Sequence, residues 1–343
     1  MRFIALLLSL SLFTQVVSAS ESTSLAKVIK RPALDWPVDC QLGQDCWIYN
    51  YVDMIPDDEK ATDRFCGART YDGHKGTDIG ILTIQEMERG VDVLAPADGI
   101  VKKTRDGDID IIKTDEEIEN IKAQRKECGN AVLIDHGDGL ETIYCHLKQN
   151  SIVVKPSSKV KAGDKIAQIG LSGVTEFPHL HFGVILRGEI IDPFTNKPNT
   201  KECGATSKGI WSQKIDDTNQ RLILNQGGFT DEIIDLNDIY NENSVKETLP
   251  QSAQKLLFWF SYLGAKKGDS INIEIFNPNL KLFASQQIIQ DKTRAQQFYY
   301  TGKKISSPPL QPGVYIGKVT IVRQIKEGQE EKWSFESTVT VLP

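Results

Sequence analysis

Short runs rich in β-branched residues, separated by glycine-containing turns, recur through most of this chain and constrain its fold more than any other feature. In one of them, Ile271, Ile273 and Ile275 alternate with polar residues, and Val339 and Val341 flank a threonine. Successive side chains of a strand point to opposite faces, so this pattern predicts strands with one buried face. We therefore expect a mainly β protein.

Six such runs lie between residues 52 and 200, where we expect an antiparallel β domain. They are Val91–Leu94, Gly99–Lys102, Asn130–Asp135, Leu140–His146, Lys165–Ile169 and Leu180–Ile185. A charged stretch from Lys103 to Lys126 interrupts them. It is too polar for the core, so we expect it at the rim of the domain, with one short helix over Asp115–Lys126.

A polar segment, residues 201–250, is expected to link this domain to a second block of six runs within residues 251–343. They are Leu256–Tyr262, Ile271–Phe276, Leu280–Phe283, Gln297–Tyr300, Val314–Val322 and Trp333–Val341. Six strands in roughly ninety residues favour a small β-sandwich of immunoglobulin-like size. The block contains no His and no Cys, so we expect no chemistry in it and consider it a surface for a protein partner.

The first nineteen residues have the order of a secretory signal peptide. Arg2 precedes the apolar run Phe3–Phe13, and the small residues of Val17–Ala19 come before Ser20. We expect cleavage before Ser20, an exported mature protein, and a polar lead-in over residues 20–51. No later apolar stretch is long enough to span a bilayer, so no transmembrane segment is expected after signal removal.

Charge argues against nucleic acid as a partner. The chain has 40 Lys and Arg against 46 Asp and Glu, a net charge of −6, and no Lys/Arg-rich run. Binding driven by phosphate neutralisation needs a basic patch or stripe. We therefore expect no nucleic-acid ligand.

The six cysteines are expected to form disulfides, because an exported protein meets an oxidising compartment and no zinc-ribbon spacing is present. Six cysteines allow fifteen connectivities, and the sequence favours only one local pair, Cys40 with Cys46. The candidates are Cys40, Cys46, Cys66, Cys128, Cys145 and Cys203.

All five histidines fall between positions 74 and 181. Three lie in short motifs with other reactive residues: His74 and Asp78 in Gly73–Asp78, and His179 with His181 in Pro178–Phe182. His179 and His181 are two apart on an expected strand, so both point to the same face and can converge on one site. The clustering predicts that the chemistry lies in the first β domain.

A hydrolytic zinc site commonly uses three protein ligands and an open position for water. His74, Asp78 and His181 would supply such a set, and His146 and His179 would then be free to move protons. There is no H-E-x-x-H motif, which excludes the thermolysin-type arrangement.

The order of the motifs resembles the lysostaphin-type (LytM-like) zinc metallopeptidases. It runs H-x-G-x-D from His74 to Asp78, Tyr-x-His-Leu around His146, Gly-x-Ser-Gly at Gly170–Gly173, and Pro-His-Leu-His-Phe at Pro178–Phe182. The resemblance covers about a third of the chain, and the motifs are specific in combination.

The resemblance implies a role for particular residues and a particular class of substrate. His74, Asp78 and His181 would bind one Zn²⁺ per chain, and His146 and His179 would be catalytic. Peptide cross-links of bacterial peptidoglycan would be the substrate, with the stem peptides as partners. The implied fold is an antiparallel β core with a groove over the metal. The stretch 103–126 is longer than the family's connection at this place and would line or cover the groove.

Two further residues have open roles. His136 stands before a Gly-Asp-Gly turn and is expected to hydrogen-bond the turn backbone rather than a metal. Tyr144 would share a strand face with His146, so it either binds substrate or packs in the core.

Two other functions remain open beside a peptidase. A catalytically silent wall-binding protein or amidase activator of the same fold is one, although such relatives usually lose a ligand position. A lipoyl-like carrier is the other, suggested by Val160–Gly170, but it lacks a lysine at the hairpin tip and conflicts with export.

Overall fold

The computed structural model describes residues 31–56, 60–200, 202–205, 207–215, 222–235, 238–240, 244–307 and 309–343. The expected signal peptide lies outside these residues. Residues 31–343 form one compact unit. No helix in the described ranges combines the length and apolarity needed to cross a bilayer.

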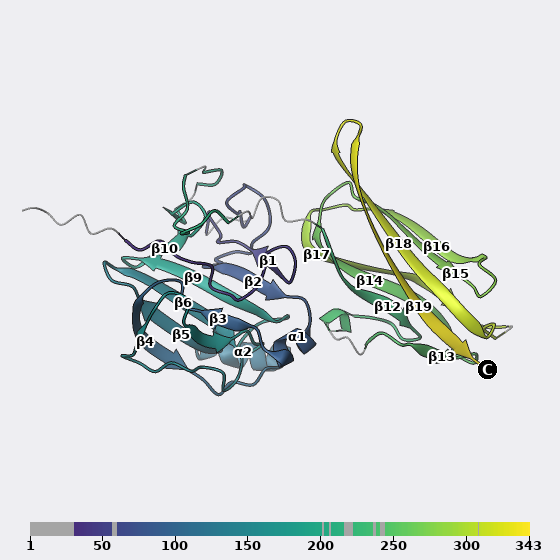
Figure 1. Cartoon of the computed structure of the whole chain (residues 1–343), viewed down its shortest axis with the longest axis horizontal. Coiled ribbons are helices and arrows are strands. Elements are labelled where there is room, and N and C mark those ends of the chain that lie inside the picture. The colour runs from purple at the N-terminus through teal and green to yellow at the C-terminus, as the bar shows by residue number, and fades with distance from the viewer. Residues whose placement is uncertain are drawn as a thin grey trace, which may run out of the picture. The chain divides into compact units, whose positions relative to one another are not determined.

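A nine-stranded sheet forms the first β region (Figure 1). Its pairings are antiparallel, and three of its strands carry the histidine motifs: β2 (Thr77–Ile81), β9 (His179–Leu186) and β6 (Leu140–Leu147), adjacent in that order. The other strands are β1 (Cys46–Asn50), β4 (Gly99–Arg105), β5 (Asn130–Asp135), β7 (Lys159–Val160), β10 (Glu189–Asp192) and β11 (Lys197–Pro198). Strands β3 (Asp92–Leu94) and β8 (Lys165–Gln168) form a separate pair.

Alternation of apolar side chains explains these strands. Along β5, Val132 and Ile134 are fully buried between half-exposed neighbours. Phe182 and Val184 on β9 and Tyr144 on β6 contribute to the same core. The six runs expected between residues 91 and 185 all correspond to strands, with ends that differ by three residues or fewer.

Two short helices border this region. Thr83 caps the N-terminus of helix α1 (Ile84–Arg89) and Thr114 that of helix α2 (Asp115–Ala123), and each threonine forms a capping box with a glutamate three residues later. Helix α2 starts at the residue expected and ends three residues earlier than expected. It buries none of its residues, in keeping with a position at the rim.

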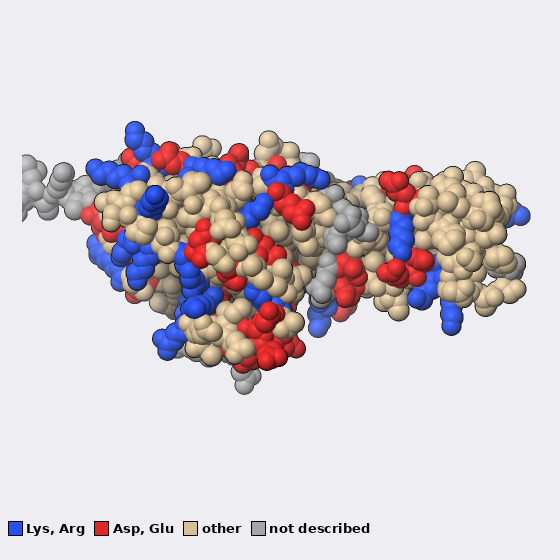
Figure 2. Space-filling view, turned by 90° about the horizontal axis from the view of Figure 1, so that it is seen from below, with Lys and Arg blue, Asp and Glu red and all other residues tan. Residues whose placement is uncertain are grey.

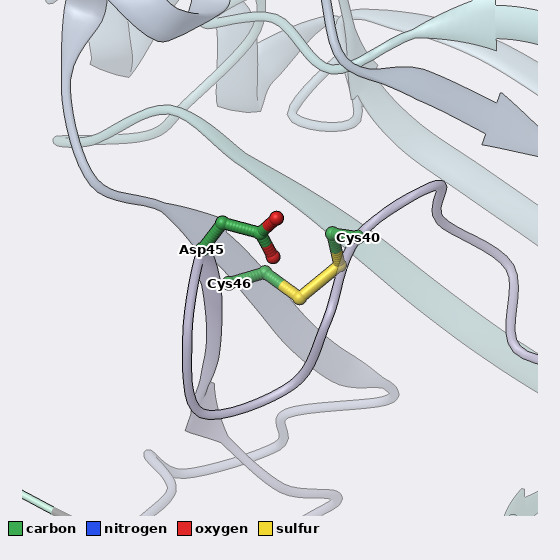
Figure 3. A group of neighbouring side chains, drawn as sticks. All are labelled: Cys40, Asp45 and Cys46. Carbon is green, nitrogen blue, oxygen red and sulfur yellow. A yellow bond between two sulfur atoms is a disulfide. The ribbon is translucent and has the colours of Figure 1, made fainter.

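All six cysteines are paired, as Cys40–Cys46, Cys66–Cys203 and Cys128–Cys145. The local pair favoured by the sequence is among them. Figure 3 shows Asp45 beside the Cys40–Cys46 bridge, a group whose three side chains come close enough to suggest a metal site. A cysteine binds a metal as its thiolate, so the disulfide removes both sulfurs as ligands.

The C-terminal region contains two more sheets (Figure 1). The three-stranded sheet has the order β12 (Ile223–Thr230), β14 (Lys255–Ala265), β17 (Arg294–Lys304). The five-stranded sheet has the order β13 (Thr248–Pro250), β19 (Gln329–Leu342), β18 (Gly313–Lys326), β15 (Ser270–Phe276), β16 (Leu282–Ile289). Phe258 and Phe260 of β14 pack with Ile271 and Ile273 of β15 in one apolar core. The chain is therefore mainly β, with additional C-terminal sheets.

Part of the segment expected as a linker is folded. Strands β12 and β13 and a short 3₁₀ helix (Asp238–Tyr240) lie within residues 201–250. A Cβ on Gly227 of β12 would lie 2.6 Å from the carbonyl oxygen of Trp259 on β14. Glycine is used here for a close approach between two strands, so this part of the expected linker belongs to the C-terminal sheets.

Acidic and basic side chains are intermixed on the face drawn in Figure 2. Such a mixture produces only weak long-range fields. Recognition of a charged polymer on this face would then depend on specific contacts.

Candidate metal centre and groove

Two neighbouring strands and the turn before them bring three of the predicted residues together. Asp78 on β2 lies directly opposite His181 on β9, and His74 belongs to the turn that leads into β2. Asp78 Oδ1 lies 3.0 Å from His74 Nε2 and 2.9 Å from His181 Nδ1, and the two histidine nitrogens are 3.0 Å apart. Residues 107 positions apart in the sequence thus point their donor atoms at one spot.

This arrangement fits zinc. Two imidazoles and one carboxylate are a common catalytic zinc set, with bonds of roughly 2.0–2.2 Å. Donors of a tetrahedral site with such bonds lie about 3.3 Å apart, close to the 2.9–3.0 Å seen here. Three donors leave a fourth position for water or substrate. His74, Asp78 and His181 are therefore a candidate zinc site.

Outer contacts fix the orientation of two ligands. His74 Nδ1 lies 2.6 Å from the carbonyl oxygen of Tyr51, so this nitrogen donates its proton and Nε2 keeps a free lone pair for the metal. The side-chain amide of Asn50 donates to Asp78 Oδ2 over 2.9 Å, which leaves Oδ1 free. Neither Tyr51 nor Asn50 was found from the sequence, because both precede the recognised motifs.

Burial and charge shift the ionisation of this cluster in opposite directions. Burial alone would raise the pKa of Asp78, but His74, His179 and a hydrogen bond from His181 hold it well below its usual value. Burial alone would lower the pKa of His74, and the Asp78 carboxylate raises it overall. Asp78 is therefore ionised and ready to bind a cation at neutral pH.

A β-bulge on β6 turns His146 toward the same site. Tyr144 pairs with Val132 and Leu147 pairs with Asn130, so Cys145 and His146 together face Ala131 alone. His146 has a φ of +59°, in the left-handed region. Its ring centre lies 4.7 Å from that of His179 and 6.1 Å from that of His181. All four predicted histidines thus meet Asp78 around one centre.

The two histidines outside the ligand set, His146 and His179, are each held by a hydrogen bond from Nδ1 to a backbone carbonyl oxygen. His146 Nδ1 lies 2.8 Å from the carbonyl oxygen of Ser172. His179 Nδ1 lies 2.9 Å from the carbonyl oxygen of Phe177 and 3.0 Å from Thr175 Oγ1. A proton on each Nδ1 leaves Nε2 as the basic atom. Burial lowers the pKa of both rings, so both are neutral and able to accept a proton.

Tyr144 does not lie with the histidines of the metal centre. It is fully buried, and its hydroxyl bonds Thr142 over 2.8 Å. The bulge is the reason, because it breaks the alternation that would have placed Tyr144 and His146 on one face. The position of Tyr144 therefore gives no support to a substrate-binding role, and Tyr144 packs in the core instead.

His136 also lies away from the metal centre. Its Nδ1 bonds the carbonyl oxygen of Asp98 over 2.9 Å and its Nε2 bonds Thr142 Oγ1 over 2.8 Å. It therefore bonds backbone as expected, but of a neighbouring segment instead of its own turn.

A groove of about 920 Å³ contains Asp78, His146 and His179. One wall comes from the charged stretch, through Ile112, Lys113, Asp115 and Ile118, and another from the C-terminal region, through Ile234, Asp235, Tyr240 and Phe298. The charged stretch therefore lines the groove.

Three alternate aspartates attach this stretch to the core. Asp106 accepts from the backbone N–H of Asn150, Asp108 from that of Gly173, and Asp110 from those of Gln149 and Leu171, over 2.6–2.9 Å. These contacts make the wall a fixed part of the groove. Lys113 lies in it, nearly buried and 3.4 Å from Asp108.

Comparison with known proteins agrees with this geometry. Residues 72–193 match peptidase family M23. An uncharacterized metalloprotease of Haemophilus influenzae is 31% identical over 134 residues, which is 39% of this chain and 23% of that protein. The DD-carboxypeptidase/endopeptidase Mpg of Neisseria meningitidis is 30% identical over 145 residues, 41% of this chain and 31% of that protein. The chain thus spans less than a third of the length of these relatives.

Solved structures also align with the chain. A zinc-containing peptidase from Vibrio cholerae aligns with 26% identity and a TM-score of 0.33, covering 47% of this chain and 39% of that one. The catalytic domain of lysostaphin from Staphylococcus simulans aligns with 21% identity and a TM-score of 0.28, covering 42% of this chain and 86% of that one. Over residues 72–193 this chain is therefore similar to members of peptidase family M23.

Proposed function

We propose that this chain is a zinc endopeptidase that hydrolyses peptide cross-links of bacterial peptidoglycan. One observation carries the proposal: three donor atoms within 3.0 Å of one another lie beside two neutral histidines that each present Nε2, and Asp78 and both of these histidines line one groove. The ligand set would be His74, Asp78 and His181, with one Zn²⁺ per chain. Retention of all five positions favours catalysis over a silent wall-binding protein or amidase activator.

The residues suggest a division of roles. A zinc ion bound by the three ligands would polarise the scissile carbonyl and acidify an attacking water. His146 and His179, neutral and with Nε2 free, would accept the proton of that water and donate it to the departing amine. Either imidazolium would also stabilise negative charge on the carbonyl oxygen. The carbonyls of Ser172 and Phe177 keep both rings in the required tautomer.

The substrate class rests on the relatives. Mpg of Neisseria meningitidis is described as a DD-carboxypeptidase/endopeptidase, and ShyB of Vibrio cholerae, 28% identical over 138 residues, as a peptidoglycan DD-endopeptidase. Peptidoglycan stem peptides would therefore occupy the groove. Its mixture of apolar walls with Lys113, Asp115 and Asp235 suits a peptide that carries both charged and apolar groups.

The protein would act outside the cytoplasm. Three disulfides favour an oxidising compartment, and with the expected signal peptide they support a periplasmic or secreted location. In this proposal residues 20–51 are a lead-in, residues 52–200 the peptidase, and residues 251–343 an immunoglobulin-like accessory domain that binds a protein partner.

Zinc analysis and muropeptide digestion test the proposal together. The purified protein should contain about one zinc per chain and release new amines from peptidoglycan, and a chelator should abolish the release. His181→Ala should lose metal and activity, whereas His146→Ala should keep metal and lose turnover. Binding to the wall without amine release would instead favour the silent scaffold. Equal metal loss in both variants would refute the division of roles.

A further inference from the structure

The Cys128–Cys145 disulfide lies at the bulge that aims His146. Cys145 pairs with His181 across β6 and β9, and residues directly opposite each other share a face of the sheet. Regular alternation would therefore send His146 to the opposite face, into the core with Tyr144. The bulge puts both Cys145 and His146 opposite Ala131 and so lets His146 stay on the metal face.

Cys128 contacts both residues of the bulge, Cys145 and His146. Its sulfur is bonded to Cys145, and its carbonyl oxygen accepts the backbone N–H of His146 over 2.9 Å. Cys128, which lies just after the charged stretch 103–126, thus holds both Cys145 and His146, the residues at which the alternation of side chains is broken.

The backbone of His146 needs such support. A left-handed conformation is unfavourable for any residue with a Cβ, and it persists when the surroundings determine it. Without the anchor at Cys128, residues 145–147 gain freedom to return to an extended strand, which would turn the imidazole away from the metal.

A second contact supports the same bulge from its other end. Ser172 Oγ donates to the carbonyl oxygen of Leu147 over 2.7 Å and accepts a hydrogen bond from the N–H of Asn130 over 3.0 Å. The carbonyl oxygen of Ser172 accepts a hydrogen bond from His146 Nδ1. The chain segments are close here: a Cβ on Gly173 would lie 2.2 Å from the carbonyl oxygen of Glu127.

We propose that the Cys128–Cys145 disulfide is a positioning device for catalysis, which locks the β-bulge that holds His146 at the metal centre. Cys128 and Cys145 are positioning residues and touch no substrate. This inference rests on the proposed peptidase function, in which His146 handles a proton.

The test removes the disulfide and measures the parameters that separate positioning from stability. In Cys128→Ala/Cys145→Ala, kcat should fall about five- to thirtyfold, the Boltzmann factor for the usual cost of left-handed backbone. KM and zinc content should stay within twofold, because the metal ligands lie on other segments. The His146 amide should exchange its hydrogen faster, since its bond to Cys128 is loosened.

Matched variants provide the controls. Cys40→Ala/Cys46→Ala removes a disulfide distant in sequence from the histidine and should leave kcat unchanged. Ser172→Ala keeps the disulfide and loosens the bulge at its other end, so it should show the same pattern even where the double cysteine variant fails to fold.

The outcomes separate the two proposals. Unchanged kcat and unchanged His146 exchange without the Cys128–Cys145 bridge would overturn the positioning role, as would an equal loss of kcat in both cysteine pairs. A zinc-loaded wild type that releases no amines would instead overturn the peptidase function, and amide exchange would still report on the bulge.

Discussion

Replacing Gly76 by alanine should damage the candidate zinc site without replacing any of its ligands. A Cβ at this position would lie 2.6 Å from Nε2 of His181, 2.7 Å from its Cε1 and 2.8 Å from the carbonyl oxygen of Phe182. Carbon atoms in contact normally stay about 3.5–4.0 Å apart, so the imidazole would have to move by roughly 1 Å.

That displacement is large compared with a metal bond. Zinc–nitrogen bonds are roughly 2.0–2.1 Å, and a working site tolerates deviations of about 0.2 Å. His181 Nδ1 would leave bonding range, or the strand would have to move. Disturbing the support of a ligand typically weakens metal binding about 10- to 100-fold, which equals about 1.4–2.7 kcal/mol. We expect Gly76→Ala at the upper end of this range.

Competition of the apoprotein with a metallochromic chelator for zinc would measure the affinity. Gly183→Ala on β9 is the matched control, because its new methyl would meet Ile143 Cγ2 of β6 at 2.6 Å and the carbonyl oxygen of Lys75 at 3.3 Å, but no metal ligand. Both variants should lower the thermal midpoint, but only Gly76→Ala should lose zinc affinity. A folded Gly76→Ala protein that binds zinc within twofold of the wild type would refute the reasoning.

Three further predictions concern stability, turnover and pH. Arg323 and Asp269 form a buried bidentate pair at 2.7 Å, so Arg323→Met should cost about 3–5 kcal/mol in urea unfolding, whereas Lys318→Met, which breaks an exposed pair with Glu336, should cost nothing measurable. Thr175→Val removes one acceptor from His179 Nδ1 and should lower kcat about two- to tenfold with zinc retained; an unchanged kcat would show that Phe177 suffices. Burial lowers the pKa of His136 in the folded protein. Below about pH 6.5 the unfolded chain therefore binds a proton at this residue that the folded protein does not bind. Wild type should therefore lose more stability than His136→Gln between pH 7.5 and 5.5, by at most about 1.4 kcal/mol per pH unit, and equal losses would contradict this.

The sequence predicts best where a local pattern has one structural solution. The run Asn130–Asp135 became β5 with the same ends, since alternating apolar residues suit only a half-buried strand. Asp115 opens α2 as expected, because Thr114 and Glu117 form a capping box. The candidate ligands His74, Asp78 and His181 were predicted from their motifs, and the convergence of their donor atoms needed only that β2 and β9 be neighbours.

Features that depend on distant segments were not predictable. Counting residues along β6 gives no sign of the bulge, which arises from pairing with β5 and reverses the expected placement of Tyr144. The partner of Cys66 lies 137 residues away, so no local pattern selects it. Strand β12 lies within the segment expected as a linker, and its Gly227 is required by the close approach of β14, which the local sequence does not show.

The Cys66–Cys203 bridge has a consequence for what proteolysis does to the protein. It closes a loop of the chain that contains all five histidines and the whole groove-lining stretch. A foreign protease that nicks an exposed turn anywhere inside this loop would produce two pieces that stay covalently joined. Such a nicked molecule would run as one band on a non-reducing gel and as two after reduction, and it would retain its metal ligands on a single linked particle.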